Sequence, residues 1–325
     1  MGAKLLEVTD LSVRFDTDDG TVHAVDRFSF ALEPRQVLAI VGESGCGKSV
    51  STMAMLRLLP PTASISGSVA FDGANLLALP PRRLRRIRGR EISFVFQEPM
   101  TSLNPVFTVG RQISEVLRKH LGLSREGARR RTLELLELVH IPAAARRIDE
   151  YPHQLSGGMR QRVMIAMALA CDPKVLVADE PTTALDVTIQ AGILDLMREV
   201  RERLGTAIIL ITHNLGVVAD IADRVIVMYA GRKAEEAPVQ ELFAHPQHPY
   251  TVGLLGAVPR PGLDGQRLQE IPGRVPSLAE LPDHCAFADR CPRADELTRS
   301  QVPPLREVRP EHLVACFHPG ERWSS

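Results

Sequence analysis

The chain has 325 residues, 44% of them hydrophobic, which is enough for one large or two modest domains with buried cores. Basic and acidic residues balance at 39 each, so no overall field favours nucleic acid as a partner, and no run of about 18 apolar residues predicts a membrane span. The N-terminus lacks the apolar region of a signal peptide, and five irregularly spaced cysteines do not suggest a disulfide framework, so a reducing, cytosolic compartment is expected.

The first 32 residues predict three strands, at residues 5–15, 21–25 and 28–32, with a turn-rich segment after the first. Phe15 ends the first strand, just upstream of the stretch described next. It is a candidate for stacking on a flat adenine ring, and the alternative for a lone phenylalanine at a strand end is a place in the core.

A phosphate-binding loop is predicted where the apolar strand 37–41 leads into Gly-Glu-Ser-Gly-Cys-Gly-Lys-Ser and a helical run, 50–59. The glycines let backbone N–H groups turn toward a phosphate at the start of a helix. Lys48 is expected to reach the β- and γ-phosphates, and the Ser49 hydroxyl to bind Mg²⁺. The candidate nucleotide-binding residues are Gly42, Glu43, Ser44, Gly45, Cys46, Gly47, Lys48, Ser49 and Val50, with Phe15.

The middle of the chain is helical. Residues 80–90 carry six arginines without interleaved aromatic residues, which favours a solvated helix face over a nucleic-acid site. A buried-type strand, 92–96, then ends at Gln97. Helical patterns follow at 109–120 and 124–139 with no strand between them, so a helical insert interrupts an otherwise alternating α/β pattern.

Acidic residues follow the next strand. The apolar run 175–178 ends in Asp179 and Glu180. After a phosphate loop, an aspartate at the end of a buried strand is the usual second Mg²⁺ anchor, and Glu180 is placed to polarise a water for attack on the γ-phosphate. His213, at the tip of the strand 207–211, is a candidate to orient that water.

A helix at 188–204 and a strand at 225–229 complete the alternating pattern. From about residue 256 onward, frequent prolines make long helices improbable. We therefore expect a small irregular extension over residues 256–325.

The sequence Leu-Ser-Gly-Gly-Met-Arg-Gln-Arg, residues 155–162, places two glycines after a serine where a helix begins. Such a helix start predicts a second anion site. Because the phosphate loop already serves the chain's own nucleotide, the economical interpretation is that this second site meets a nucleotide held by a partner chain.

In this order, the motifs resemble those of the ATP-binding subunits of ABC transporters over residues 5–230. His213 matches the switch histidine, Gln97 the Q-loop and Ala184–Asp186 the D-loop, with Asp186 its acidic member. The signature matches at Leu155, Ser156, Gly157, Gly158, Met159 and Gln161.

The resemblance implies an ATPase that uses ATP and Mg²⁺. Its catalytic residues would be Glu180, His213, Lys48 and Gln97, and its Mg²⁺ ligands Ser49, Gln97 and Asp179. The implied fold is an α/β P-loop NTPase (RecA-like) core of ABC-ATPase type with an antiparallel β subdomain. The nucleotide-binding domain would span residues 1–255, with a helical subdomain inserted at about 98–160.

The tail resembles that of the oligopeptide/dipeptide importer branch of the family. The matching segments are His248–Thr251, Ile271–Gly273, Arg290–Pro292, Pro303–Leu305 and His312–Cys316. The resemblance implies a peripheral subunit on the cytoplasmic face of the inner membrane that works with two permease subunits, a second and related ATPase subunit and an extracytoplasmic solute-binding protein, without nucleic acid. An importer of nickel or another small solute, and a soluble ABC ATPase without a transport role, are the alternatives.

In that branch the tail often supplies four cysteines to a 4Fe–4S cluster. This sequence keeps three, Cys285, Cys291 and Cys316, and the missing position falls near Thr298, which cannot provide a thiolate. Two interpretations stay open. Either His284, His312 or His318 completes an iron–sulfur site, or the tail folds around three free thiols.

Overall fold

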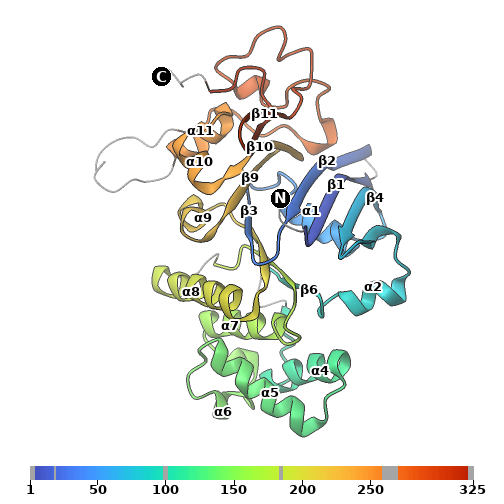
Figure 1. The fold of residues 1–325 in the computed structure, drawn as a ribbon, viewed down its shortest axis with the longest axis vertical. Helices are drawn as coiled ribbons and strands as arrows, with labels where there is room; N and C mark the ends of the chain where they lie inside the picture. The colour runs from blue at the N-terminus through green and yellow to red at the C-terminus, as the bar shows by residue number, and fades with distance from the viewer. Residues whose placement is uncertain (1–3, 18–19, 98–101, 183–185, 258–269, 321–325) are drawn as a thin grey trace. The chain divides into compact units, whose positions relative to one another are not determined.

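The computed structural model describes residues 4–17, 20–97, 102–182, 186–257 and 270–320. The chain divides into two compact units. Unit 1 comprises residues 1–32, 37–78 and 211–325, and unit 2 comprises residues 33–36 and 79–210. Figure 1 gives the labels of the helices and strands in both.

Unit 1 contains an antiparallel sheet with the strand order β2-β1-β4-β5. Apolar side chains alternate in two stretches of β1, where Leu6 and Val8 and then Leu11 and Val13 are buried on either side of a register shift. This period of two gives the sheet one core face and one polar face. The strands are β1 (Leu6–Thr17), β2 (Gly20–Leu32), β4 (Ala63–Phe71) and β5 (Ala74–Asn75).

The two strands predicted at 21–25 and 28–32 form one strand, β2, so this prediction is wrong. Arg27 takes a left-handed φ of 47°, and the pairing of β1 with β2 shifts register between Leu11 and Val13. The hydroxyl of Ser12 accepts a hydrogen bond from the Arg27 N–H at 2.9 Å. The irregularity is therefore a bulge satisfied from the neighbouring strand, and the strand continues through it.

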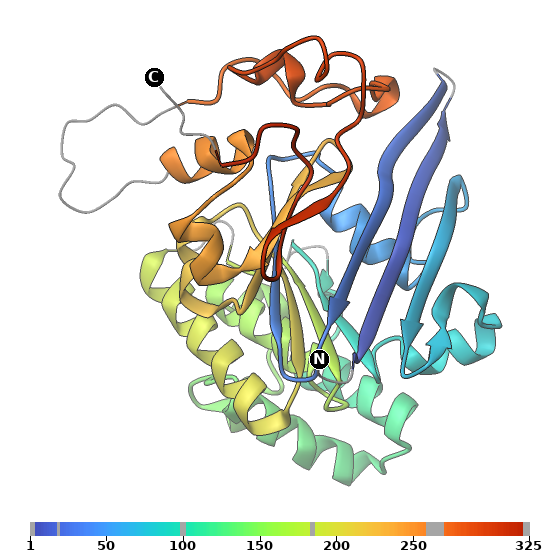
Figure 2. The same cartoon turned by 45° about the horizontal axis from the view of Figure 1, so that its top comes forward.

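Five further strands of unit 1 are neighbours in the order β11-β12-β10-β9-β3. β3 runs parallel to β9 with all five of its residues buried, as expected for a strand covered on both faces. The strands of the C-terminal extension add to the edge of this sheet beyond β10 (Figure 2). The strands are β3 (Val37–Val41), β9 (Arg224–Tyr229), β10 (Arg232–Pro238), β11 (Arg306–Arg309) and β12 (His312–Val314).

Short helices complete unit 1. α1 follows the phosphate loop, α9 begins at the Asn214 cap, and α10 and α11 precede the extension. Between residues 270 and 320 the only helical turns are 3₁₀ turns, η3 (Leu278–Glu280) and η4 (Ala288–Arg290), which agrees with the proline content there. The α-helices are α1 (Lys48–Met55), α9 (Leu215–Ile221), α10 (Val239–Ala244) and α11 (Pro249–Gly256).

Unit 2 has strands in the order β8-β7-β6, with β7 parallel to β6. These strands are β6 (Ile92–Val95), β7 (Val175–Asp179) and β8 (Ala207–Ile211, whose last residue falls in unit 1). The helices are α2 (Pro81–Ile87), α4 (Val109–Leu121), α5 (Arg125–Leu138), α6 (Ala144–Arg147), α7 (Gly157–Ala168) and α8 (Val187–Leu204).

The two helices predicted for the insert, at 109–120 and 124–139, form within one residue of those bounds as α4 and α5. Thr108 and Ser124 cap α4 and α5 by accepting backbone N–H groups, and α4 ends at Gly122 in a left-handed conformation. The two helices lie side by side in unit 2 (Figure 1). Their buried side chains include Ile113 and Leu117 of α4, so an apolar stripe at helical spacing holds the insert together.

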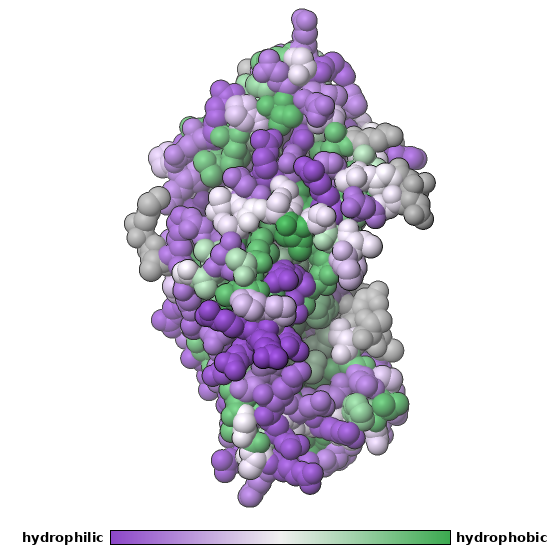
Figure 3. Space-filling model, turned by 90° about the vertical axis from the view of Figure 1, so that its right-hand side faces the viewer, coloured by the Kyte–Doolittle hydropathy of each residue, from purple (hydrophilic) through white to green (hydrophobic). Residues whose placement is uncertain are grey.

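The surface is largely polar. On α2 the arginines 82, 83, 85 and 86 are exposed while Leu84 is buried, so the arginine-rich stretch is a solvated face of a short helix. Hydrophilic residues dominate the side of the molecule in Figure 3, with hydrophobic residues scattered among them. Across the described ranges, no helix combines the length and apolarity that a membrane crossing requires.

Candidate functional site

The phosphate loop joins the buried strand β3 to α1, as predicted. Ser44 and Gly45 are exposed at its tip, whereas Cys46, Gly47 and Lys48 are buried. The first N–H groups of α1 have no partner four residues back along the helix, so they are available to an anion at this end. The loop therefore has the form of an anion site at a helix N-terminus.

Gly47 is required by the geometry of this loop. It caps α1 with a φ of 97°, and a Cβ atom there would lie 2.4 Å from the carbonyl oxygen of Ala24. Gly45 also has a positive φ, of 80°, but a Cβ atom there would have no neighbour within 4 Å. Close backbone approach constrains Gly47, and conformation alone constrains Gly45.

Lys48 lies across the loop with only 6% of its surface exposed. Its Nζ donates hydrogen bonds to the carbonyl oxygens of Gly42 at 2.8 Å and Glu43 at 2.9 Å. Burial raises the pKa of the neighbouring Cys46 thiol, and the positive charge of Lys48 only partly opposes this. Cys46 is therefore a neutral packing residue, and Lys48 is the cation of the loop.

Unit 2 carries the acidic pair. Asp179 is the buried last residue of β7, and Glu180 follows half-buried with a left-handed φ of 46°. Gln97, two residues beyond the end of β6, donates a hydrogen bond from Nε2 to Glu180 Oε2 at 2.9 Å. The structure thus brings Gln97 and Glu180 together, a contact that the sequence did not predict.

The signature forms the start of α7 in unit 2. Ser156 is the N-cap and accepts the Met159 N–H at 3.4 Å, and Ser156 and Gly157 are exposed. Gly158 is buried, and a Cβ atom there would lie 2.8 Å from Ile189 of α8. Leu155 and Gln161 are also buried. One side of this helix start faces solvent while the other packs on α8.

Three further predicted site residues, His213, Phe15 and Asp186, lie in different parts of the chain. His213 is exposed, next to Asn214, which caps α9. Phe15 is half-buried on β1, paired with Val22 of β2, so its stacking role stays a prediction. Asp186 caps α8 by accepting the Ile189 N–H at 2.9 Å, and the other two D-loop residues, 184 and 185, lie outside the described residues.

The three cysteines of the extension are half-buried thiols. Burial raises the pKa of each, and that of Cys316 reaches about 11, with Cys285 and Cys291 adding to the effect. Thr298 stands beside Cys285, whose N–H donates to the Thr298 carbonyl oxygen at 3.1 Å. Its own hydroxyl donates to the Asp295 carbonyl oxygen at 2.8 Å.

These donors do not fit an iron–sulfur cluster. Two of the three histidines considered as a fourth ligand are paired with carboxylates, His312 with Glu235 at 2.6 Å and His318 with Asp295 at 2.9 Å. Within the described part of the chain, no group of three or more His, Cys, Asp or Glu side chains is arranged to hold a metal ion. Four thiolates normally hold such clusters, and the extension supplies three.

Sequence reasoning missed two residues that hold the phosphate loop, Tyr250 and Arg290. Tyr250 accepts the backbone N–H of Glu43 at 2.8 Å, and Arg290 donates to the Glu43 carboxylate at 3.0 and 3.1 Å. Both belong to short motifs of the tail that the sequence analysis used only for the resemblance. The one available signal was their position in those motifs, since the contacts themselves span more than 200 residues.

Comparison with known proteins agrees with these features. A family model described as "ABC transporter" matches residues 25–183, and a second, described as "Oligopeptide/dipeptide transporter, C-terminal region", matches residues 234–297. The chain is 52% identical to a probable peptide ABC transporter ATP-binding protein of Sinorhizobium fredii, over 98% of this chain and 96% of the relative. It is 51% identical to the oligopeptide transport ATP-binding protein OppD of Salmonella typhimurium, over 98% of this chain and 94% of OppD.

Solved structures show the same fold. One is the dimeric structure of a post-hydrolysis state of the ATP-binding cassette MJ0796, bound to ADP and phosphate. Its sequence is 29% identical to this chain with a TM-score of 0.65, and the match covers 72% of this chain and 98% of MJ0796. The structure of cbiO1 from Clostridium perfringens, part of the ABC transporter complex cbiONQ, is 31% identical with a TM-score of 0.62, and the match covers 74% of this chain and 91% of cbiO1. The predicted fold class is confirmed.

The two loop glycines give a first prediction. Gly45→Ala adds only the left-handed strain of an L-residue, about 1–2 kcal/mol. Gly47→Ala adds the clash with Ala24 as well, a further loss of about 1–3 kcal/mol. Urea unfolding of the full chain is expected to show the larger loss of unfolding free energy for Gly47→Ala. Equal losses in the two variants would mean that the close approach to Ala24 does not constrain the loop.

Proposed function

Because the chain belongs to the ATP-binding subunits of ABC transporters, which bind and hydrolyse ATP, we propose that it powers the import of di- or oligopeptides through partner permeases. The observation that carries the proposal is the pairing of an intact phosphate loop and signature with the peptide-transporter type of C-terminal region. The relatives named above are described as peptide-transport proteins, and the match covers nearly their whole length. This supports peptide as the solute class.

The residues of unit 1 are assigned to the triphosphate. The N–H groups of the loop and of the first turn of α1 cradle the phosphates, with Gly42–Val50 as the lining. Lys48, already buried in the loop, exchanges its bonds to backbone carbonyl oxygens for bonds to the β- and γ-phosphates. The Ser49 hydroxyl is assigned to Mg²⁺, which neutralises phosphate charge when bound, and Phe15 to the adenine ring.

The residues of unit 2 are assigned to hydrolysis. Asp179 and Gln97 are proposed Mg²⁺ ligands, and Glu180 is the proposed general base for the attacking water. The hydrogen bond from Gln97 to Glu180 supports this assignment because it orients the carboxylate. His213, in unit 1, is proposed to contact the γ-phosphate.

The signature is proposed to serve ATP bound by a second ATPase subunit. Ser156 and Gly157 expose the start of α7 to solvent, so its N–H groups are open to an anion carried by another chain. Asp186, also exposed, is assigned to the same contact between subunits. The second ATPase is proposed to be a related but different chain, as the resemblance to the peptide-importer branch implies.

The helical insert is the proposed docking site for two permease subunits. Val106 precedes α4 and is 68% exposed. The loop that carries it is held next to residues 148–150, where the N–H groups of Val109 and Gly110 donate to the carbonyl oxygens of Glu150 and Ile148. The exposed Tyr151 follows directly, so an apolar contact area lies on one stable loop pair.

Such docking places the chain at the cytoplasmic face of the inner membrane as a peripheral subunit. An extracytoplasmic solute-binding protein would then deliver the solute to the permeases. The solute itself does not touch this subunit. Import of nickel or another small solute is the second candidate, because the same type of subunit can serve permeases of different specificity.

The assignment of Glu180 gives the second prediction. Glu180→Gln keeps the size and the hydrogen bond to Gln97 but cannot accept a proton, so the full chain is expected to bind MgATP with ATP hydrolysis slowed about 100-fold or more. The matched control is Glu134→Gln on the exposed surface of α5, which is expected to hydrolyse ATP at the wild-type rate. Turnover by Glu180→Gln at the wild-type rate would identify a different base.

The proposed complex is tested by capture. Tagged Glu180→Gln is expressed in the native host, membranes are solubilised with MgATP, and the proteins that co-purify are identified by mass spectrometry. The expected result is two polytopic permeases and a second ATPase. Recovery of soluble partners without a membrane protein would contradict the transport role and leave only the ATPase activity.

The docking loop gives the third prediction. Val106→Asp places a charge in the proposed contact area and is expected to lower the yield of co-purified permease about tenfold or more, because the burial of one aliphatic side chain is lost and a charge must be desolvated. Val308→Asp, at an exposed valine of β11, is the control and is expected to retain the permease. Equal retention by both variants would place the permease contact elsewhere.

A further inference from the structure

Glu43 is the second residue of the phosphate loop, and the C-terminal part of the chain holds it at two points. The Tyr250 hydroxyl oxygen of α11 accepts its backbone N–H at 2.8 Å. The Nη1 of Arg290 donates to both of its carboxylate oxygens, at 3.0 and 3.1 Å. Both contacts lie within unit 1. The backbone and the side chain of one loop residue are therefore fixed by the tail.

Arg290 is built into the extension so that its guanidinium cannot turn away. Its Nε donates to the Pro272 carbonyl oxygen at 2.8 Å, and its Nη2 to that of Ile271 at 3.1 Å. Gly273 leaves room for it, because a Cβ atom there would lie 3.1 Å from the Arg290 Cγ. The side chain is 5% exposed. A planar fork with several donors is needed here, and a lysine could not replace it.

An aromatic cluster supports the same contact. The rings of Tyr229, Tyr250 and Phe287 lie edge to face or tilted, with centroids 4.6 to 5.6 Å apart. The Arg290 guanidinium lies 5.8 Å from the Tyr229 ring centroid. Tyr229 ends β9, the strand that pairs with β3 directly before the phosphate loop. The cluster thus joins the extension to the base of the loop.

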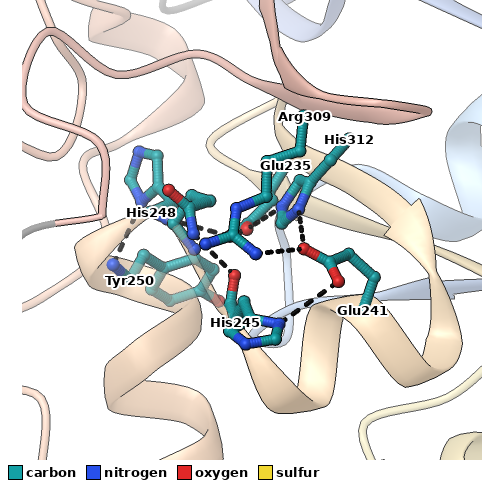
Figure 4. A network of polar contacts seen from close by, with 8 residues as sticks. Glu235, Glu241, His245, His248, Tyr250, Arg309 and His312 are labelled. Atoms are coloured by element: carbon teal, nitrogen blue, oxygen red, sulfur yellow. Dashed lines mark hydrogen bonds and ion pairs between the residues drawn. The ribbon is translucent and has the colours of Figure 1, made fainter.

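A buried network of hydrogen bonds fixes the second contact, that of Tyr250 (Figure 4). Glu235 of β10 is fully buried and pairs with His312 Nε2 of β12 at 2.6 Å. The same carboxylate accepts the backbone N–H groups of Gln247 at 2.7 Å and His248 at 3.0 Å. One carboxylate therefore joins a strand of the extension to the start of α11, which carries Tyr250.

His248 continues this chain of contacts to Tyr250. Burial lowers the pKa of His248 to about 4, so its ring is neutral at pH 7. A neutral ring can accept a hydrogen bond, and its Nδ1 accepts the Tyr250 N–H at 3.0 Å. Glu241 extends the network at the surface, where it contacts Arg309 and His245 (Figure 4).

The charge of Glu43 gives these contacts a consequence for nucleotide binding. A carboxylate in a loop that binds a triphosphate repels it, and the repulsion grows as water leaves the site. Arg290 supplies the opposite charge within hydrogen-bond distance. It removes the repulsion and holds the carboxylate on the side of the loop that faces the extension.

We propose that the C-terminal extension positions the phosphate loop for ATP, with Arg290 and Tyr250 as positioning residues that act through Glu43. The inference rests on the proposed role of Gly42–Val50 in ATP binding. It gives the extension a part in nucleotide binding by this chain itself, in addition to any role in recognising partner subunits.

The test is a titration of the purified full-length chain with the fluorescent analogue methylanthraniloyl-ATP in Mg²⁺. Arg290→Gln leaves the Glu43 carboxylate uncompensated and is expected to raise the Kd about fivefold to tenfold. The difference from wild type should shrink as ionic strength rises, because salt screens the exposed charge. The control is Arg299→Gln, which breaks an exposed pair with Asp289 in the same extension and is expected to leave the Kd within twofold.

A double-mutant cycle separates this role from a general loss of structure. In a Glu43→Gln background there is no carboxylate to compensate, so adding Arg290→Gln is expected to change the Kd less than twofold. If the two changes instead multiply, or if Arg290→Gln alone binds ATP normally, the inference is wrong. Thermal unfolding of the same variants records the separate loss of the bonds to Ile271 and Pro272.

Tyr250→Phe provides a second, milder variant. It keeps the ring in the aromatic cluster and removes only the acceptor of the Glu43 N–H, so the Kd is expected to rise about threefold or more. Lys48→Ala in the same assay tests the ATP site itself. Loss of binding in Lys48→Ala with normal binding in Arg290→Gln and Tyr250→Phe would overturn this inference alone, whereas normal binding in Lys48→Ala would overturn the ATP site.

Discussion

The central constraint in this protein is a turn that is costly to form. Between β3 and α1 the backbone passes through positive φ values at Gly42, Gly45 and Gly47. Such a turn persists only when its surroundings hold it. β3 is buried along its whole length, Gly47 packs against the backbone of β2, and Lys48 crosses the loop to its carbonyl oxygens.

The rest of unit 1 continues this support outward. β9 pairs with β3, β10 and β12 extend the sheet, and the buried pair of Glu235 and His312 joins the extension to α11. Removing one partner of this buried contact would leave the other without its hydrogen bond, which typically costs about 1–3 kcal/mol, so the contact fixes the extension to the sheet. The tail therefore belongs to the folded core that carries the phosphate loop, which explains why its short motifs include residues in contact with Glu43.

Local sequence patterns predicted many of the helices and strands. The features that they missed depend on contacts between residues far apart in the sequence. Strand ends, the loop glycines and the two helices of the insert are set by neighbouring residues, so spacing located them. The continuity of β2 depends on Ser12 in another strand, and the contact of Arg290 with Glu43 joins residues 247 positions apart. No periodicity within a window of the sequence carries such information. The roles assigned to Asp179, Glu180 and His213 likewise come from motif and resemblance, and stay predictions.

The most direct test of the account is ATP-driven peptide uptake. The assay uses whole cells of the native host that lack this chain. The cells are complemented with the wild-type chain or with Lys48→Ala. The account predicts that a labelled di- or oligopeptide enters only the cells with the wild-type chain. Equal peptide uptake in both strains, or wild-type-dependent uptake of a metal ion without any of peptide, would contradict it.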